Sequence, residues 1–210
     1  MNLSFWLKHP HLVGPRLLMW AREVIDPDRP WLCPGTIRFC ERALAGSQRG
    51  IEFGGGRSTR WLAGLTQRLI TIEHDREWRE RIARSLQRSG VELGPERVDL
   101  RWVPLDHPPE EPERPEYDPI PRYVAQADTV EDGTLDFALI DGHYRTHCVR
   151  RVLPKLRTGG LLIVDDINLW PGPADLPIPS SWTLADDSSN GLKRCMIWRA
   201  GQGRTGPTPH

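Results

Sequence analysis

The sequence predicts an α/β fold, in which helices cover both faces of a mostly parallel sheet. Three observations support this prediction. Apolar strand patterns at 69–72, 135–140 and 161–164 are short and almost continuous, as expected for strands buried on both faces. Helical patterns alternate with these strands along the chain. Three consecutive glycines at 54–56 join a first strand to a helix, and such a turn lets a ligand approach the backbone closely.

Composition indicates a single domain that is not specialised for polyanions. The chain has 210 residues, with 28 Lys and Arg against 28 Asp and Glu, so neither nucleic acid nor an anionic membrane is expected as its main partner. No apolar run approaches the length of about 18 residues needed to span a membrane, and the N-terminus lacks the apolar core of a secretory signal. The cysteines form no paired motif, which favours reduced thiols in a cytoplasmic protein: Cys33, Cys40, Cys148 and Cys195.

The N-terminal residues 1–48 are predicted to form a helical extension. An amphipathic helix over 12–24 is followed by the proline-containing stretch 26–30, and a second helix is expected to begin at Pro34 and end at Gly46. Residues 49–200 then form the sheet domain, and 201–210 are expected to be a disordered tail. The pattern suits an extension that covers the ligand site and equally one that only packs against the domain.

Residues 50–75 contain the strand, glycine turn, helix and second strand of a nucleotide-binding unit. The second strand ends on Glu73, whose carboxylate can accept both hydroxyl groups of a ribose. Gly54 and Gly56 fit the start of a dinucleotide fingerprint, but Thr59 stands where that fingerprint has its third glycine. The unit therefore indicates a cofactor with a ribose and leaves its class open.

The middle of the chain continues the alternation of helices and strands. Asp75 is expected to cap a helix, and a third strand spans 98–103, shortly before Asp106. The proline-rich, acidic segment 107–121 cannot be regular structure, and its place suits either a substrate lid or a loop without function. A short helix is expected within 123–130.

The C-terminal half is predicted to complete the sheet. A helix after the strand 135–140 carries apolar residues through 148–156 and is expected to end at Gly159 and Gly160. The buried strand 161–164 follows. Two short strands at 181–184 and 194–198 are expected to form a reversed hairpin at the edge of the sheet.

Three carboxylates follow two of the buried strands. Asp141 comes directly after the strand 135–140, and Asp165 and Asp166 come directly after the strand 161–164. Ligands of open α/β sheets bind at the carboxyl ends of strands, and these two strands should be neighbours, so the three side chains are expected to converge. Converging like charges repel unless a cation lies between them. Oxygen ligands without cysteine favour Mg²⁺ or Mn²⁺ over Zn²⁺.

The run E-x-G-x-G at 52–56 resembles motif I of class I S-adenosylmethionine (SAM) methyltransferases. This resemblance implies a Rossmann-like, seven-stranded, mostly parallel sheet with helices on both faces, and SAM as the cofactor. It also implies the residues that bind SAM. Ser58 departs from the pattern, since many relatives have a glycine there. The implied cofactor-binding residues are Glu52, Gly54, Gly55, Gly56, Ser58, Glu73, Asp106 and Asp141.

The segments 138–156 and 159–168 resemble metal-dependent sugar O-methyltransferases, which methylate deoxysugars of macrolide and aminocoumarin antibiotics. Mycobacterial enzymes that methylate mannose-containing polysaccharides are a related possibility. The shared pattern, I-D-G-H followed by G-G-x-x-x-x-D-D, implies that Asp141, Asp165 and Asp166 hold Mg²⁺ (or Mn²⁺). It places His143 as the base, where relatives often have Asp. The acceptor would be a hydroxyl of a sugar or saccharide, and relatives often form homodimers.

Other functions are compatible with these motifs. A catechol-type O-methyltransferase differs mainly in having Asn where this chain has Asp166. An NAD-binding oxidoreductase is opposed by the missing third glycine and by the absence of a Tyr-x-x-x-Lys pair. An inactive SAM-binding module is a third alternative.

Structural roles compete with functional ones at several positions. His143 could hydrogen-bond a loop carbonyl, with Tyr144 and His147 as rival bases, and the aspartates could be ordinary loop residues. Trp170 and Trp182 could stack on a sugar, but aromatic residues more often belong to the core.

Overall fold

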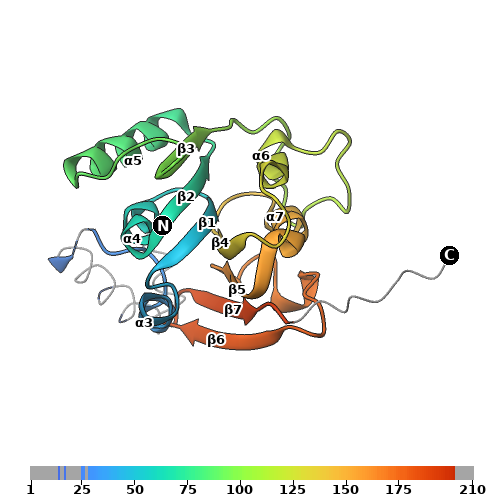
Figure 1. Cartoon of the computed structure of the whole chain (residues 1–210). Helices are drawn as coiled ribbons and strands as arrows, with labels where there is room; N and C mark the ends of the chain where they lie inside the picture. Colours follow the sequence, from blue (N-terminus) through green and yellow to red (C-terminus); the bar gives the residue numbers. More distant parts are fainter. Residues whose placement is uncertain (1–13, 15–16, 18–24, 27, 202–210) are drawn as a thin grey trace.

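The computed structural model describes residues 14, 17, 25–26 and 28–201. Its centre is one seven-stranded sheet with the order β3-β2-β1-β4-β5-β7-β6 (Figure 1). The first five strands in this order are parallel, and β7 pairs antiparallel with both β5 and β6, as the edge hairpin predicted from the sequence requires. The strands are β1 (Ser47–Phe53), β2 (Thr66–Glu73), β3 (Val98–Trp102), β4 (Leu135–Ile140), β5 (Leu156–Val164), β6 (Thr183–Ser189) and β7 (Arg194–Arg199).

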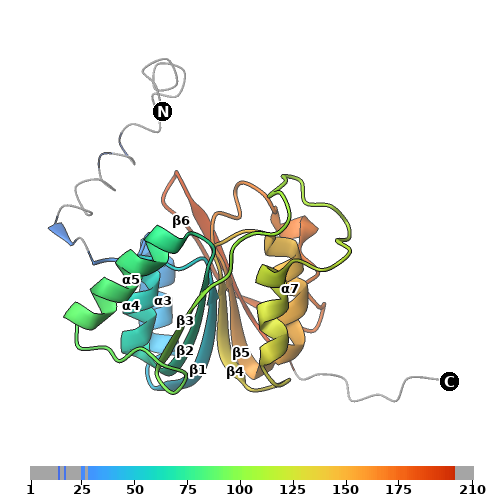
Figure 2. The ribbon, with the colours of Figure 1, turned by 90° about the horizontal axis from the view of Figure 1, so that it is seen from above.

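Helices cover both faces of the sheet, which confirms the predicted fold class (Figure 2). One face carries α3 (Pro34–Ala43), α4 (Arg57–Leu65) and α5 (Arg76–Arg88), and the other carries α6 (Arg122–Ala125) and α7 (Arg145–Val152). Short 3₁₀ turns lie at η2 (Gln126–Thr129), η3 (Leu153–Lys155) and η4 (Pro173–Asp175). Among the described residues, no helix is both long and apolar enough to cross a bilayer.

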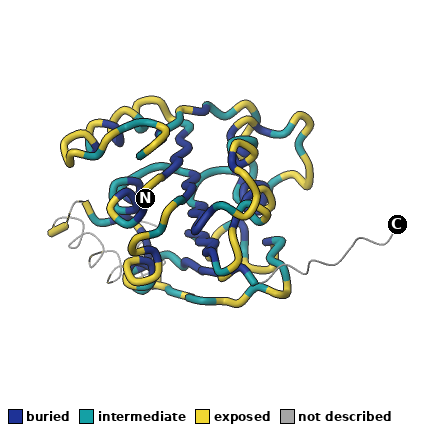
Figure 3. Tube along the Cα trace, viewed as in Figure 1, coloured by how far each residue is buried: buried dark blue, intermediate teal, exposed yellow. Residues whose placement is uncertain are grey.

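Alternating side chains of the strands divide the core into two layers. In β4, Phe137 and Leu139 pack with the layer under α3, α4 and α5, while Ala138 and Ile140 pack with the layer under α6 and α7. Every residue of β4 is buried, and the central strands form the buried middle of the molecule (Figure 3). This two-sided burial explains why their sequences are almost continuously apolar.

Local signals in the sequence account for two helix starts. Pro34 is the first residue of α3, where its missing N–H costs nothing. Asp75 precedes α5, and its Oδ1 accepts a hydrogen bond of 2.8 Å from the backbone N–H of Trp78. Both predictions are confirmed. Most of the predicted helix over 12–24 and residues 202–210 of the predicted tail lie outside the described residues.

The prediction that Gly159 and Gly160 end a helix is wrong. Helix α7 ends at Val152, and both glycines lie inside β5. There the pairing of β4 with β5 shifts register between Leu135 and Phe137, and Gly159 has φ +79°. A Cβ on Gly160 would lie 2.8 Å from the Arg157 carbonyl oxygen. The irregular pairing, and not a helix end, is therefore the reason for these glycines.

The segment 107–121 has no regular structure, as predicted, but it packs against the start of α7. A carboxylate oxygen of Glu113 accepts a hydrogen bond of 3.1 Å from the Thr146 backbone N–H. The Nε2 of His147 lies 2.8 Å from the Arg114 carbonyl oxygen. Buried polar side chains thus hold the segment beside the edge of the sheet where the candidate site lies.

Candidate active site

A cavity of about 350 Å³ opens at the carboxyl ends of β1, β2 and β4. A larger cavity, of about 450 Å³, lies between the segment 107–121 and α7, where its walls mix acidic and basic side chains. The smaller one is the candidate site because it contains the glycine turn and strand-end residues predicted from the sequence. It is lined by Trp31, Gly54, Gly55, Gly56, Arg57, Ser58, Glu73, His74, Trp78, Glu111, Asp141, Gly142, His143 and Arg145.

The glycine turn lies against the backbone that follows β4. Gly54 has φ +90°, and its N–H donates to the Ile72 carbonyl oxygen at 2.9 Å. A Cβ at this position would lie 2.7 Å from the Asp141 carbonyl carbon and oxygen. Positive φ and the lack of space both require glycine here. The turn therefore brings the first and fourth strands together at the cavity.

Glu52 lies beneath the glycine turn, inside the protein, and does not line the cavity. Its carboxylate is fully buried and accepts hydrogen bonds from Ser58 Oγ (2.5 Å), Thr59 Oγ1 (2.7 Å) and Thr71 Oγ1 (2.8 Å). The Thr59 hydroxyl in turn accepts the Gly56 N–H at 3.0 Å. Burial raises the pKa of Glu52 to about 7, although the three hydroxyl donors oppose the shift.

The raised pKa of Glu52 predicts a stability change with pH. The folded state holds a proton on Glu52 up to about pH 7, whereas the unfolded state releases it near about pH 4.5. The stabilising contribution is therefore complete at low pH and is lost as pH rises through about 7, a loss of up to about 3 kcal/mol. Glu52→Gln should lose this part of the pH dependence.

Urea unfolding at about pH 5 and about pH 8 measures this contribution. The difference in free energy of unfolding between the two conditions should be larger for the unmodified chain than for Glu52→Gln. All other titrating groups are common to both proteins. Equal differences would show that Glu52 titrates normally.

Glu73 ends β2 and lines the cavity, and its carboxylate also holds the surrounding backbone. Oε2 accepts from the Gly55 N–H at 3.1 Å, and Oε1 accepts from the Asp75 N–H at 2.7 Å. His74 Nδ1 lies 2.9 Å from the same Oε1. Burial raises the pKa of Glu73. Counting two lone pairs per oxygen, the described contacts leave an acceptor position on Oε2 for a ligand hydroxyl.

Arg57, the first residue of α4, has a guanidinium in the cavity wall. Its guanidinium carbon lies 4.9 Å from the centroid of the Trp31 ring. Its Nη1 is buried and has no hydrogen-bond partner among the residues that the structure describes. A buried donor without an acceptor costs about 1–3 kcal/mol, and more when it is charged. The arrangement therefore suits a ligand with an anionic group.

Asp141, Asp165 and Asp166 converge as predicted. One carboxylate oxygen from each lies within 4.8 Å of the other two. Asp165 is fully buried, and its Oδ1 has no hydrogen-bond partner among the described residues. Burial, and next the Asp165 carboxylate, raise the pKa of Asp141 well above its ordinary value. Such a group of oxygens has the donor chemistry of a Mg²⁺ or Mn²⁺ site.

Two cationic side chains border these aspartates. The Nζ of Lys193 contacts Asp165 Oδ2, lies 3.4 Å from Asp166 Oδ1 and donates to the Trp31 carbonyl oxygen at 2.8 Å. Arg145 Nη2 lies 3.9 Å from both Asp141 and Asp166. Its Nη1 donates to the Asp165 carbonyl oxygen at 3.0 Å. The sequence did not predict that Lys193 would lie at the site. Arg145 forms its ion pairs with two of the predicted metal ligands, Asp141 and Asp166.

Backbone strain is found beside the same carboxylates. Among the described residues, the two non-glycine residues with positive φ are Tyr144 (φ +51°) and Asp166 (φ +52°). A left-handed conformation costs a residue with a Cβ roughly 1–2 kcal/mol. Strain of this kind concentrates at functional sites, where the surrounding structure maintains it.

His143 follows the same strand end as Asp141 and lines the cavity. Its ring packs edge-on against His74, with the centroids 4.5 Å apart. Burial lowers the pKa of His143, and the neighbouring His74 and Arg145 add to this. The imidazole is therefore held in its neutral form, which can accept a proton.

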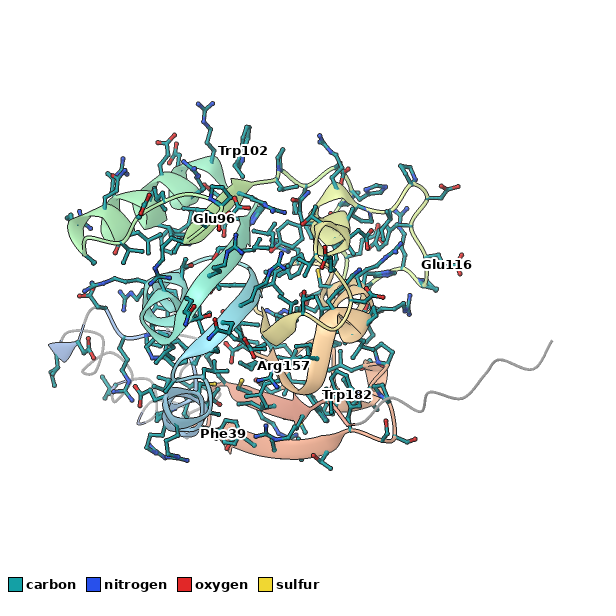
Figure 4. All side chains as sticks on the ribbon, in the orientation of Figure 1. Phe39, Glu96, Trp102, Glu116, Arg157 and Trp182 are labelled. Carbon is teal, nitrogen blue, oxygen red and sulfur yellow. The ribbon has the colours of Figure 1, made fainter. Side chains whose placement is uncertain are left out.

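Other candidate residues lie away from the cavity. The Asp106 carboxylate accepts hydrogen bonds from Arg122, at 3.1 Å from Nε. His147 is bonded to the segment 107–121, as described above, and Tyr144 donates its hydroxyl proton to the His107 carbonyl. Trp182 packs against the core beside β6 (Figure 4). Neither Trp182 nor Trp170 lines the cavity.

A family profile described as Methyltransferase domain matches residues 51–167, more than half of the chain. No curated protein sequence matches. A methyltransferase from Geobacter sulfurreducens has a similar structure, with a TM-score of 0.57 and 18% identity over 86% of this chain and 88% of that one.

Two further solved structures share the fold. An rRNA methylase from Streptococcus thermophilus has a TM-score of 0.55 and 13% identity over 80% of this chain and 95% of that one. A mutant of MtNAS in complex with S-adenosylmethionine has a TM-score of 0.50 and 12% identity over 78% of this chain and 59% of that one. At such low identities the similarity concerns the fold alone.

Proposed function

This chain belongs to the family of methyltransferase domains, and on that premise we propose that it transfers a methyl group from SAM to a hydroxyl of a sugar or saccharide, with Mg²⁺ or Mn²⁺ in the site. One observation supports the proposal most directly. The carboxylates of Asp141, Asp165 and Asp166 converge beside the cavity that contains the glycine turn and His143. The groups that we propose to bind the cofactor, bind the metal and accept the proton thus share one edge of the sheet.

The cavity has the groups that SAM requires. The glycine turn allows close backbone approach, and Glu73 offers an acceptor for a ribose hydroxyl. Arg57 offers a buried N–H to a carboxylate, and SAM carries one at its amino-acid end. SAM supplies the methyl group on a positively charged sulfur.

Arg57→Met should weaken binding of S-adenosylhomocysteine by roughly tenfold or more, because a hydrogen bond to a charged group contributes about 1.5–3 kcal/mol. Methionine keeps an unbranched apolar side chain against the Trp31 ring. Binding of 5′-methylthioadenosine, which has the nucleoside and no carboxylate, should change little. Calorimetric titration of both ligands measures the two effects. Equal weakening of both ligands would show that Arg57 acts on the shape of the cavity and does not bind a carboxylate.

The aspartates would hold the metal ion. Three carboxylate oxygens within 4.8 Å of one another repel, and burial together with the neighbouring Asp165 carboxylate raises the pKa of Asp141, which supports a cation between them. A divalent cation there would lower the pKa of an acceptor hydroxyl and orient it. His143 lines the same cavity with a neutral imidazole and would accept the hydroxyl proton.

A small or saccharide acceptor fits the charge of the protein better than nucleic acid does. Basic and acidic residues are equal at 28 each, so the electrostatic attraction that nucleic acid binding requires is absent from the overall balance. The acid at position 166, where catechol-type enzymes have Asn, favours a sugar over a catechol. The four cysteines are free and buried, which is consistent with the proposed cytoplasmic location.

Release of S-adenosylhomocysteine from SAM tests the proposed function. The full chain is incubated with a panel of monosaccharides, oligosaccharides and catechols, with Mg²⁺ or with EDTA. Turnover on a saccharide that requires Mg²⁺ is expected. Asp165→Asn should abolish it, and Asp187→Asn is the matched control, because Asp187 forms a solvent-accessible ion pair with Arg194.

Other outcomes identify the alternatives. Turnover in EDTA would remove the metal from the proposal, and turnover on catechols alone would change the acceptor class. Binding of NADH without binding of SAM would indicate an oxidoreductase. Binding of SAM without turnover on any acceptor class would favour an inactive SAM-binding module.

A further inference from the structure

Lys193 places an ammonium group at the carboxylates proposed to hold the metal. It lies between β6 and β7, in a loop that no motif of the sequence connects with the site. Its Nζ contacts Asp165 and lies 3.4 Å from Asp166, so it reaches two of the three convergent carboxylates. A divalent cation bound to these aspartates would have to share their oxygens with Lys193.

We propose that Lys193 and a divalent cation bind the same carboxylates in alternation, so that Lys193 sets the metal affinity of the site. The inference rests on the proposed function, because it concerns the same metal site. Two positive charges this close repel, and the oxygens of Asp165 and Asp166 that face Lys193 cannot contact a metal ion at the same time. The ammonium must therefore withdraw when the metal ion binds.

The surroundings of Lys193 allow such a withdrawal. Its Nζ also donates to the Trp31 carbonyl oxygen at 2.8 Å, and this acceptor remains when the carboxylates are given up. The side chain is 17% exposed, so water can reach it, whereas Asp165 is fully buried. Leaving Asp165 without any cation would be costly, because an isolated buried charge costs several kcal/mol. The lysine thus supplies a counter-charge to Asp165 when metal is absent.

Arg145 does not compete in the same way. Its Nη2 lies 3.9 Å from Asp141 and Asp166, and its other nitrogens donate to the carbonyl oxygens of Gly142 (2.9 Å) and Asp165 (3.0 Å). These backbone contacts hold the guanidinium at the border of the site. Lys193 is therefore the side chain whose removal should change metal binding most.

Calorimetric titration of the full chain with Mn²⁺ tests the inference. Lys193→Met should bind Mn²⁺ roughly tenfold or more tightly than the unmodified chain, because a charge within about 4–6 Å shifts an ionic equilibrium by one to three powers of ten. Lys193→Arg keeps the charge and should bind like the unmodified chain. Lys155→Met is the matched control, since Lys155 makes a comparable ion pair with Asp132 at 2.7 Å, away from the site.

Thermal unfolding provides a second readout. Without metal, Lys193→Met should unfold at a lower temperature than Lys155→Met, and Mn²⁺ should raise its unfolding temperature more than that of the unmodified chain. Equal Mn²⁺ affinity of the unmodified chain and Lys193→Met would overturn the inference and leave the metal site intact. Failure of Mn²⁺ to bind any of these proteins would overturn the metal site itself. If Lys193→Met stays unfolded in Mn²⁺, a divalent cation cannot replace the lysine, and the inference is wrong.

Discussion

Replacement of His143 by Ala is expected to lower the rate of methyl transfer by a factor on the order of 10²–10⁴, the range that general-base catalysis contributes. The imidazole lines the cavity next to Asp141 and is held neutral by burial. Binding of SAM should remain largely intact. The described hydrogen bonds that hold the glycine turn, and the contact of Arg57 with Trp31, do not involve the side chain of His143. The measurement is single-turnover methyl transfer, with calorimetry for SAM.

The control for this substitution is His147→Gln. His147 was a rival base in the sequence, but its ring is bonded to the segment 107–121 and does not line the cavity. Its substitution should leave the single-turnover rate close to that of the unmodified chain. Near-normal transfer by His143→Ala would remove His143 from the mechanism. If only His147→Gln lowers the rate of methyl transfer, His147 and not His143 acts as the base.

The second large effect is expected from Gly54→Ala. A Cβ at this position lies 2.7 Å from the Asp141 carbonyl and the Gly142 nitrogen, and φ is +90°. Overpacking costs about 1–3 kcal/mol, and a strained backbone costs a similar amount, so the free energy of unfolding should fall by roughly 2–6 kcal/mol. The added Cβ would push the glycine turn away from the end of β4. Any folded fraction should therefore bind SAM weakly, because the two segments form the cavity together. Urea unfolding and calorimetry measure both effects.

Gly64→Ala is the matched control for Gly54→Ala. Gly64 lies in the exposed part of α4, and a Cβ there meets no other atom within 4 Å. Alanine should therefore stabilise the helix by about 0.5–1 kcal/mol, the opposite sign. If Gly54→Ala unfolds like the unmodified chain and binds SAM normally, the turn is not the rigid element described here.

Much of the fold could be predicted from local sequence. The buried strands were apparent because two-sided burial leaves a continuous apolar run, and the strand 135–140 agrees with β4 at both ends. Gly159 and Gly160 were misassigned because glycine after a helical pattern also marks a helix end. Their actual cause is the shifted pairing of β5 with β4, which depends on contacts between segments and leaves no local pattern.

The site was predictable where strand ends supply it. Asp141, Asp165 and Asp166 meet because parallel neighbouring strands end at one edge, and this holds whatever the loops do. Residues from the loops were missed, since Trp31 and Lys193 reach the site only through tertiary packing. Arg57 could have been noticed, because it follows the glycines directly at the start of a helix. Glu52 was expected to contact the cofactor, and the structure shows its carboxylate buried, where it accepts hydrogen bonds from Ser58 and Thr59.

The bond between Lys193 and the Trp31 carbonyl joins residues that are 162 positions apart in the chain. The region around the aspartates therefore cannot be completed until residue 193 has left the ribosome. Contacts of such long range are also the ones that form slowly, because a large loop must close first. Before the hairpin of β6 and β7 pairs with β5, Asp165 is open to water on that side, and the hairpin that covers it also brings Lys193. The same hairpin thus supplies the counter-charge at the moment when the core closes over the acid.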